Sequence, residues 1–175
     1  MLEISVLFVV IKPKEQRVVV LIDVQNLYHS AKNLYGARVN FREVLKTAIA
    51  GRKLIRAFAY VVRTKTGEEK PFFEALIKLG FETRVRDLQE FYGGMKKADW
   101  DVGITIDAIK TAPTVDAVVL VSGDGDFIQL VEYLKNQGKR TEVMAFGKTT
   151  SAKLKEIADE FIDLDKYPEK YLFKK

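Results

Sequence analysis

The stretch Arg-Val-Val-Val-Leu-Ile-Asp-Val-Gln-Asn, residues 17–26, decides the fold class of this 175-residue chain. Its first part is a nearly continuous β-branched and aliphatic run without polar alternation, which is typical of a strand buried on both faces. Residues 117–121, Ala-Val-Val-Leu-Val, repeat this pattern. Because strands of this kind occur in parallel sheets covered by helices on both sides, the two stretches indicate an α/β protein.

The rest of the chain alternates between helical and strand patterns. Apolar residues at helical spacing predict helices that end near Gly36, Gly51, Gly80, Pro113 and Gly138, and a short helix at residues 152–157. Strands are expected at residues 17–22, 54–62, 81–86, 117–121, 140–145 and 161–164, with a short extra strand at 88–92. This alternation predicts a three-layer α/β/α domain around a central, mainly parallel sheet.

Composition excludes several classes of protein. The chain has no Cys and a single His, so a disulfide framework or a zinc site of thiolates is not expected. No apolar run reaches the roughly 18 residues that a membrane helix needs, and no basic segment precedes the first apolar run, so we expect a cytoplasmic protein without membrane contact.

One domain is expected at residues 17–165, between an N-terminal extension (1–16) and a basic C-terminal tail (166–175). The apolar run at residues 2–11 is either an added edge strand or a sequence start placed upstream of the core. Whether the chain forms a homo-oligomer stays open.

Charge is distributed unevenly along the chain. The net charge is +5, yet residues 38–70 carry nine basic and three acidic side chains, whereas residues 99–132 carry seven acidic and one basic. This pattern is typical of a polyanion binder whose carboxylates are concentrated for metal, and Arg52, Lys53 and Arg56 are the cations expected to hold the polyanion. The alternative is that both blocks are solvated surface.

Three carboxylates follow the two most apolar strands. Asp23 comes directly after the first, and Asp124 and Asp126 follow the second within Ser-Gly-Asp-Gly-Asp-Phe, residues 122–127. Ligands of open parallel sheets bind at the carboxyl ends of the strands, where tips of adjacent strands lie about 5 Å apart. Crowded carboxylates repel one another unless a divalent ion binds, so the sequence predicts a cation site there. Taken alone, Asp23 is also a typical helix N-cap.

A fourth acid, Asp101, opens the helix whose apolar face we expect to be Val102, Ile106 and Ile109. Asp107 lies six positions further, about 120° around the helix, so we interpret it as structural or as an outer-shell group. Asp99 is interpreted as the N-cap of this helix.

Other candidate residues have ordinary interpretations. His29 has no evident partner and is interpreted as a surface or core histidine. Trp100 and Phe127 are interpreted as packing residues rather than platforms for bases. Lys96 and Lys97 precede Asp101 and either meet a nucleic-acid backbone or belong to a solvated loop.

Three motifs in this order resemble the NYN domain, a PIN-like nuclease group that includes the LabA/DUF88 proteins. They are Val-Leu-Ile-Asp-Val-Gln-Asn-Leu-Tyr (20–28), Ala-Asp-Trp-Asp-Val-Gly-Ile-Thr-Ile-Asp-Ala (98–108) and Leu-Val-Ser-Gly-Asp-Gly-Asp-Phe (120–127). The resemblance covers nearly the whole chain and departs mildly at Val24, where the family usually has Gly. It implies a PIN-like fold and a metal-dependent site with these members: Asp23, Asp101, Asp124 and Asp126, with Asn26 and Ser122 beside them.

The expected function is a ribonuclease that uses Mg²⁺ or Mn²⁺ to hydrolyse phosphodiester bonds in single-stranded RNA, because oxygen ligands select hard cations. In this hypothesis Asp23, Asp101 and Asp124 hold metal, and Asp126 completes a second site or orients the water. The substrate side is assigned to Asn26, Ser122 and Lys97.

Three other functions are compatible with parts of this sequence. The most serious is a non-catalytic regulatory or RNA-binding protein that retains the metal site. A haloacid-dehalogenase-like phosphatase needs a second Asp at the position of Gln25. A Toprim-like site normally has Glu as its earlier acid.

Overall fold

The computed structural model describes residues 12–94 and 96–173 and contains a six-stranded parallel sheet. Its strand order is β3-β2-β1-β6-β7-β8. The bounds are β1 (Arg17–Asp23), β2 (Lys53–Arg63), β3 (Glu82–Asp87), β6 (Ala117–Val121), β7 (Arg140–Ala145) and β8 (Glu160–Asp163). The predicted α/β/α architecture is confirmed, and each strand bound equals the expected one or differs from it by one residue.

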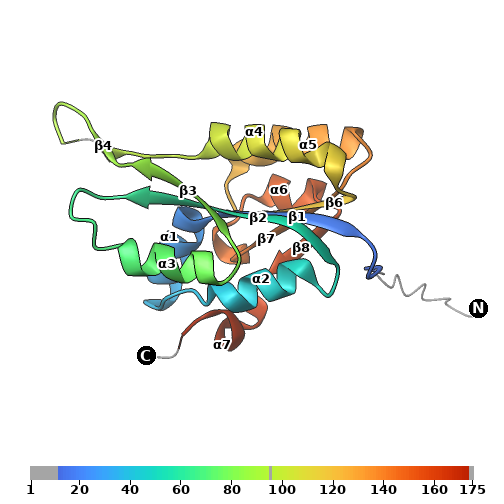
Figure 1. Ribbon diagram of the computed structural model, residues 1–175, viewed down its shortest axis with the longest axis horizontal. Coiled ribbons are helices and arrows are strands. Elements are labelled where there is room, and N and C mark those ends of the chain that lie inside the picture. Colours follow the sequence, from blue (N-terminus) through green and yellow to red (C-terminus); the bar gives the residue numbers. More distant parts are fainter. Residues whose placement is uncertain (1–11, 95, 174–175) are drawn as a thin grey trace, which may run out of the picture.

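Helices cover both faces of the sheet. One face carries α1 (Val24–Tyr35), α2 (Phe41–Ile49), α3 (Lys70–Lys78) and α7 (Pro168–Tyr171). The other carries α4 (Asp101–Thr111), α5 (Ile128–Asn136) and α6 (Ala152–Ile157). In Figure 1, α4 and α5 lie above the sheet and α2, α3 and α7 below it.

Two hydrophobic cores explain the apolar strands. Along β1, Val20 and Ile22 pack with the α1 face, whereas Val19 and Leu21 pack with the α4 face. All four side chains are fully buried. Because successive side chains of a strand point to opposite faces, a strand between two helical layers must be apolar at every position.

The register brings the predicted site together at one edge of the sheet. Ile22 of β1 pairs with Val121 of β6, so Asp23 and Ser122 follow the ends of neighbouring parallel strands. From β1 the chain adds β2 and β3 on one side, and it then adds β6, β7 and β8 on the other side. The boundary between β1 and β6 is therefore the topological switch point, where open α/β sheets form their binding crevice.

The prediction that Val102, Ile106 and Ile109 form the buried face of α4 is wrong. Val102, Ile106 and Ile109 are 67%, 45% and 39% exposed, and the buried side chains of this helix are Ile104, Ala108 and Thr111. The tyrosine hydroxyl of Tyr60, on the sheet, donates a hydrogen bond to Asp107 Oδ2 over 2.9 Å. The side of α4 that faces the sheet is therefore the one with Ile104, Ala108 and Asp107.

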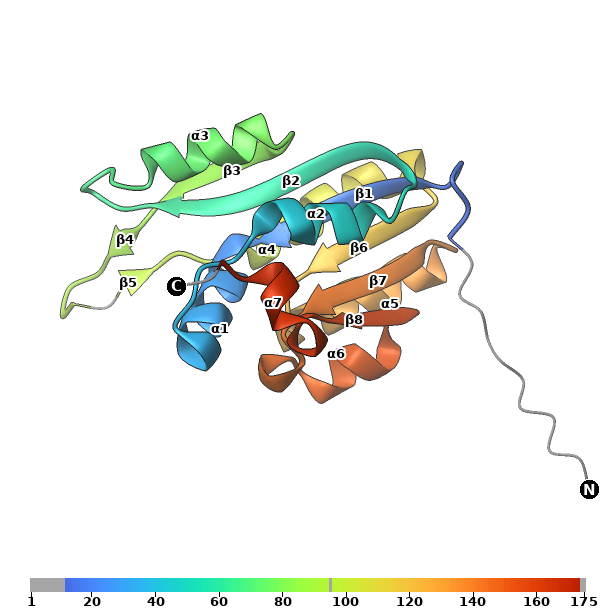
Figure 2. The same ribbon diagram turned by 90° about the horizontal axis from the view of Figure 1, so that it is seen from below.

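A short antiparallel hairpin connects β3 to α4. It consists of β4 (Gln89–Glu90) and β5 (Lys96–Lys97), so the extra strand expected at 88–92 is present but shorter. Figure 2 shows the hairpin extending beyond the carboxyl ends of β2 and β3.

The predictions for the two terminal segments of the chain compare differently with the structure. The apolar run at residues 2–11 lies outside the described residues. The segment expected as a basic tail packs on the domain as far as it is described, since Tyr171 is 3% exposed and its carbonyl accepts a hydrogen bond from the Asn40 N–H over 2.7 Å.

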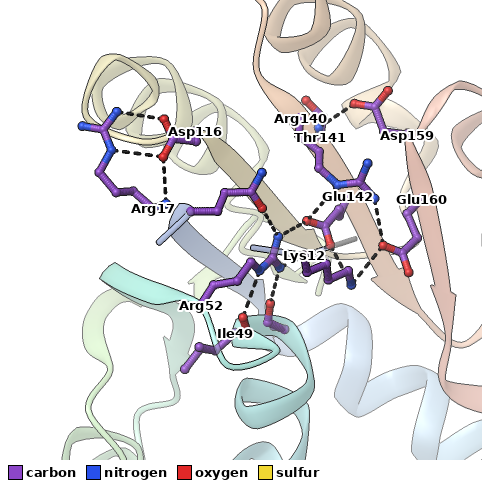
Figure 3. A network of polar contacts seen from close by, with 12 residues as sticks. Lys12, Arg17, Ile49, Arg52, Asp116, Arg140, Thr141, Glu142, Asp159 and Glu160 are labelled. Atoms are coloured by element: carbon purple, nitrogen blue, oxygen red, sulfur yellow. Dashed lines mark hydrogen bonds and ion pairs between the residues drawn. The ribbon is translucent and has the colours of Figure 1, made fainter. Parts of the chain in front are cut away.

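Arg52, one of the cations expected to hold a polyanion, belongs to a buried network of ion pairs. The Arg52 guanidinium lies 2.6 Å from the Glu142 carboxylate, and both side chains are fully buried. Lys12 and Arg140 bridge Glu142 to Glu160, as Figure 3 shows. Arg52 precedes β2 and therefore lies at the amino ends of the strands, opposite Asp23.

Four other cations of the basic stretch form ion pairs at the surface. Lys53, Arg56, Arg63 and Lys65 each form an ion pair with a carboxylate at 2.7 to 3.5 Å. The expectation that Arg52 holds a polyanion is therefore wrong, because its guanidinium is buried against Glu142. The side chains of Lys53 and Arg56 are 60% and 40% exposed in their ion pairs, so their contact with a polyanion stays a prediction.

Candidate metal centre

Three of the four predicted acidic side chains come together. Asp101, Asp124 and Asp126 each offer a carboxylate oxygen, and the three oxygens lie within 4.8 Å of one another. Asp101 is the first residue of α4, whereas Asp124 and Asp126 belong to the turn after β6. Oxygens that share one Mg²⁺ lie at most about 4.2 Å apart, so a small side-chain rotation closes this group around a cation.

The turn that carries Asp124 and Asp126 is fixed by hydrogen bonds. The Asp126 N–H donates to Asp124 Oδ1 over 3.0 Å, and the Gly123 N–H donates to Asn26 Oδ1 over 3.0 Å. A Cβ atom at Gly123 would lie 2.6 Å from the Thr150 hydroxyl oxygen. Glycine is therefore required here because the segment after β7 packs directly against the turn.

Asp23 has a different environment from the other three acids. Its Oδ1 accepts the Asn26 N–H over 3.2 Å, which caps α1, and its Oδ2 accepts the hydroxyl of Ser122 over 3.0 Å. The Ser122 side chain is fully buried, and its oxygen also accepts the Asp124 N–H over 3.3 Å. Asp23 thus holds the adjacent turn through Ser122, and both of its oxygens are engaged.

Electrostatic repulsion in the group is visible in the pKa values. Burial, followed by the charges of Asp124, Asp23, Asp99 and Asp126, raises the pKa of Asp101 from 3.8 to about 6. Burial also raises the pKa of Asp23, although its bonds to Asn26 and Ser122 oppose the rise. A divalent cation would favour the ionised form of every one of these groups, so the donor set fits Mg²⁺ or Mn²⁺.

Asp107 has the structural role that its position on α4 predicts. Its carboxylate accepts the hydroxyl of Tyr60 and lies 3.4 Å from the Arg84 guanidinium. Phe127 is fully buried in the core, as expected, and His29 is exposed.

The expected N-cap of α4 is wrong. The cap residue is Trp100, whose indole N–H donates to the Val61 carbonyl over 3.0 Å, and Asp99 does not cap the helix. A Cβ atom at Gly103 would lie 2.6 Å from the Trp100 ring. The ring therefore packs over the first turn of α4 and sets where Asp101 begins the helix.

The remaining predicted residue, Lys97, lies on β5 opposite Gln89, four positions before Asp101. Sequence reasoning missed Tyr60, Gly103 and Thr150, which position the acidic residues. Of these, only Gly103 carried a signal, because glycine inside a helix costs about 1 kcal/mol and is retained for a packing reason.

The fold and the acidic group identify a PIN-like domain, and residues 17–165 match the NYN domain. The chain belongs to the NYN domain family, whose members are generally nucleases that use divalent metals. It is 29% identical to the low amplitude and bright protein LabA of Synechococcus elongatus over 161 residues, covering 87% of this chain and 86% of that protein.

Two further similarities extend this comparison. An uncharacterised protein of Methanocaldococcus jannaschii is 26% identical over 155 residues, which are 86% of this chain and 56% of that protein. The crystal structure of a Vibrio parahaemolyticus protein of unknown function superposes with a TM-score of 0.83 and 33% identity, covering 93% of this chain and 99% of that one. Among the described residues, no helix has the length and apolar character needed to cross a membrane.

Proposed function

We propose that this protein is a ribonuclease that uses Mg²⁺ or Mn²⁺ to cleave single-stranded RNA. The observation that carries the proposal is the group of Asp101, Asp124 and Asp126, whose oxygens lie within 4.8 Å of one another at the carboxyl edge of a parallel sheet. Membership of a family of nucleases supports it.

In this proposal Asp101, Asp124 and Asp126 hold the metal, which when bound activates water and stabilises the charge that develops on the phosphate. Asp23 positions the turn through Ser122 and approaches the metal only if it releases one of its hydrogen bonds. Asn26 holds Gly123 in place and therefore acts on the turn.

A preference for single strands is supported by the hairpin before Asp101. Its tip exposes Phe91 and Tyr92, and unpaired bases stack on such rings. Lys97 on β5 would meet the backbone of the bound strand, because β5 runs into the helix that begins with Asp101.

Cleavage of a labelled single-stranded RNA in the presence of Mn²⁺ tests the proposal. Asp124→Asn should abolish turnover while leaving the protein folded, because it removes one ligand charge. The matched control is Asp116→Asn, the same change at the amino end of β6, where Asp116 pairs with Arg17. Equal rates in the native protein and in Asp124→Asn would show that a contaminating nuclease is responsible, and the proposal would fail.

The second candidate is a regulatory RNA-binding protein that retains the metal site. It is favoured by the engagement of both Asp23 oxygens, which leaves three carboxylates for the cation. Metal-dependent RNA binding without cleavage, over RNAs of varied sequence, would select it.

A further inference from the structure

A large cavity in the described part of the chain lies on the face of the sheet away from α4. It has a volume of about 880 Å³ and is bounded by α1, α3 and the carboxyl end of β2. Its lining is mostly apolar, with Val61 and Leu76 buried at 1% exposure. This volume falls within the range of about 300–1,000 Å³ that small-molecule and cofactor sites occupy.

Aromatic side chains surround this cavity and remain accessible. Tyr28 on α1, Phe72 on α3 and Phe173 near the chain end are 48%, 37% and 50% exposed. The Phe72 ring lies 5.6 Å from that of Phe41, which is buried beneath it. Exposed rings beside an apolar cavity offer flat faces to a ligand without being needed to close the core.

Three cations that line the cavity differ from the paired cations of residues 52–65. Arg38, Arg42 and Lys78 all line it, and within residues 12–94 and 96–173 none of them has a carboxylate at ion-pair distance. The lining has a single acid, Glu69, whose carboxylate accepts hydrogen bonds from Thr64. The positive charge of the cavity is therefore available to an anionic ligand.

The cavity adjoins the segment that follows Asp23 at the carboxyl end of β1. Val24 and Gln25, which follow Asp23 directly, line it, as does His29 one turn later on α1. An RNA strand that extends from the acidic group past Asp23 would reach this cavity.

We propose that this cavity binds unpaired nucleotides of the RNA strand that is held at the metal centre. The bases stack on Tyr28, Phe72 and Phe173, and the flanking phosphates meet Arg38, Arg42 and Lys78. The inference rests on the proposed function and specifies its substrate: only a strand with unstacked bases can insert them, so duplex RNA is excluded.

Binding to fluorescent RNA tests this inference in the Asp124→Asn background, where no cleavage occurs. Three probes of equal length are compared: a single strand, the same strand in a duplex, and a strand of abasic nucleotides. Tyr28→Ala or Phe72→Ala should weaken binding of the single strand about tenfold while leaving the abasic strand unaffected. Arg42→Gln should weaken both strands and lower the slope of log affinity against log salt by about one.

Tyr167→Ala is the matched control, since Tyr167 is 58% exposed and does not line the cavity. Melting temperatures establish that each variant is folded, and the exposed Tyr28 keeps the test valid if Phe72→Ala is unstable. Unchanged binding of the single strand by folded Tyr28→Ala and Arg42→Gln would overturn the inference that the cavity binds nucleotides and would leave the proposed function intact. Failure of the unsubstituted background to bind any single strand would overturn both.

Discussion

At the residue scale, the group of Asp101, Asp124 and Asp126 lowers the stability of the metal-free protein and provides ligands for a cation. The pKa of Asp101 is about 6 in the folded protein against an ordinary 3.8, so ionised Asp101 disfavours folding. The unfolded chain loses this proton first as the pH rises, and stability therefore falls between these two values. Groups arranged in this way are typical of functional sites.

Removing the charge of Asp101 should stabilise the protein when no metal is present. At about pH 8 with a chelator, Asp101→Asn should melt about 2 °C or more above the native protein, and the difference should disappear near pH 4, where Asp101 is protonated. Excess Mn²⁺ should reverse the order, because the cation stabilises only the native site. A variant less stable than the native protein at both pH values without metal would contradict this account of Asp101.

At the scale of elements, α4 is set in place by polar contacts that determine where Asp101 points. The hydroxyl of Tyr60 on β2 donates to Asp107, and Arg84 on β3 pairs with the same carboxylate. Burial, followed by the bond to Asp107, raises the pKa of Tyr60, so it stays a donor at neutral pH. The helix is therefore anchored at its middle while its first residue reaches the acidic group.

Loss of this anchor should weaken metal binding as well as stability. Tyr60→Phe should lower the free energy of unfolding by about 1 kcal/mol, measured by urea denaturation, and reduce Mn²⁺ affinity measured by calorimetry. Tyr35→Phe is the matched control, because Tyr35 also donates to a carboxylate, that of Asp165, on the other face of the sheet. Equal losses of metal affinity in both variants would show that α4 is not specifically positioned by Tyr60.

The first turn of α4 depends on the absence of a side chain at Gly103. Alanine at this position would gain about 1 kcal/mol of helix propensity. Its Cβ would collide with the Trp100 ring, and overpacking of this kind destabilises a protein by about 1–3 kcal/mol. Gly103→Ala should therefore melt below the native protein. Trp100 is the single tryptophan, so a changed fluorescence spectrum would report its displacement, and an unchanged spectrum with a higher melting temperature would contradict the clash.

At the scale of the whole molecule, the carboxyl ends and the amino ends of the strands carry different arrangements of charge. The carboxyl edge has the acidic group, which a cation would neutralise. The amino edge has the network of Arg52, Glu142 and Glu160, which is neutralised within the protein and joins α2 to β7 and β8.

Breaking this network should destabilise the whole domain without acting on the metal centre. Glu142→Gln leaves the Arg52 guanidinium buried and unpaired in charge, so the free energy of unfolding should fall by about 3–5 kcal/mol. Burial raises the pKa of Glu142, but the contacts with Arg52 and Lys12 outweigh it and hold this pKa below its ordinary value, so this stability should also be lost as the pH falls through the lowered pKa. Simultaneous replacement of Arg52 and Glu142 by Met should recover most of the loss in urea denaturation; a single variant as stable as the native protein would refute this role.

The sequence by itself determined the layers, the side of the sheet on which the site lies and the turn that holds Asp124 and Asp126. These features follow from local information: apolar runs mark buried strands, glycines mark turns, and parallel strands must end at one edge. The same local logic led to the NYN family, because its motifs are short and contiguous.

Only the tertiary structure decided which charges are free. Asp23 is engaged by Ser122, 99 positions away, and Arg52 by Glu142, 90 positions away. The buried face of α4 was likewise decided by Tyr60, 47 positions from Asp107. A hydrogen bond or ion pair depends on distance in space, and for residues so far apart in the chain that distance is settled by the packing of the whole domain and not by any local pattern.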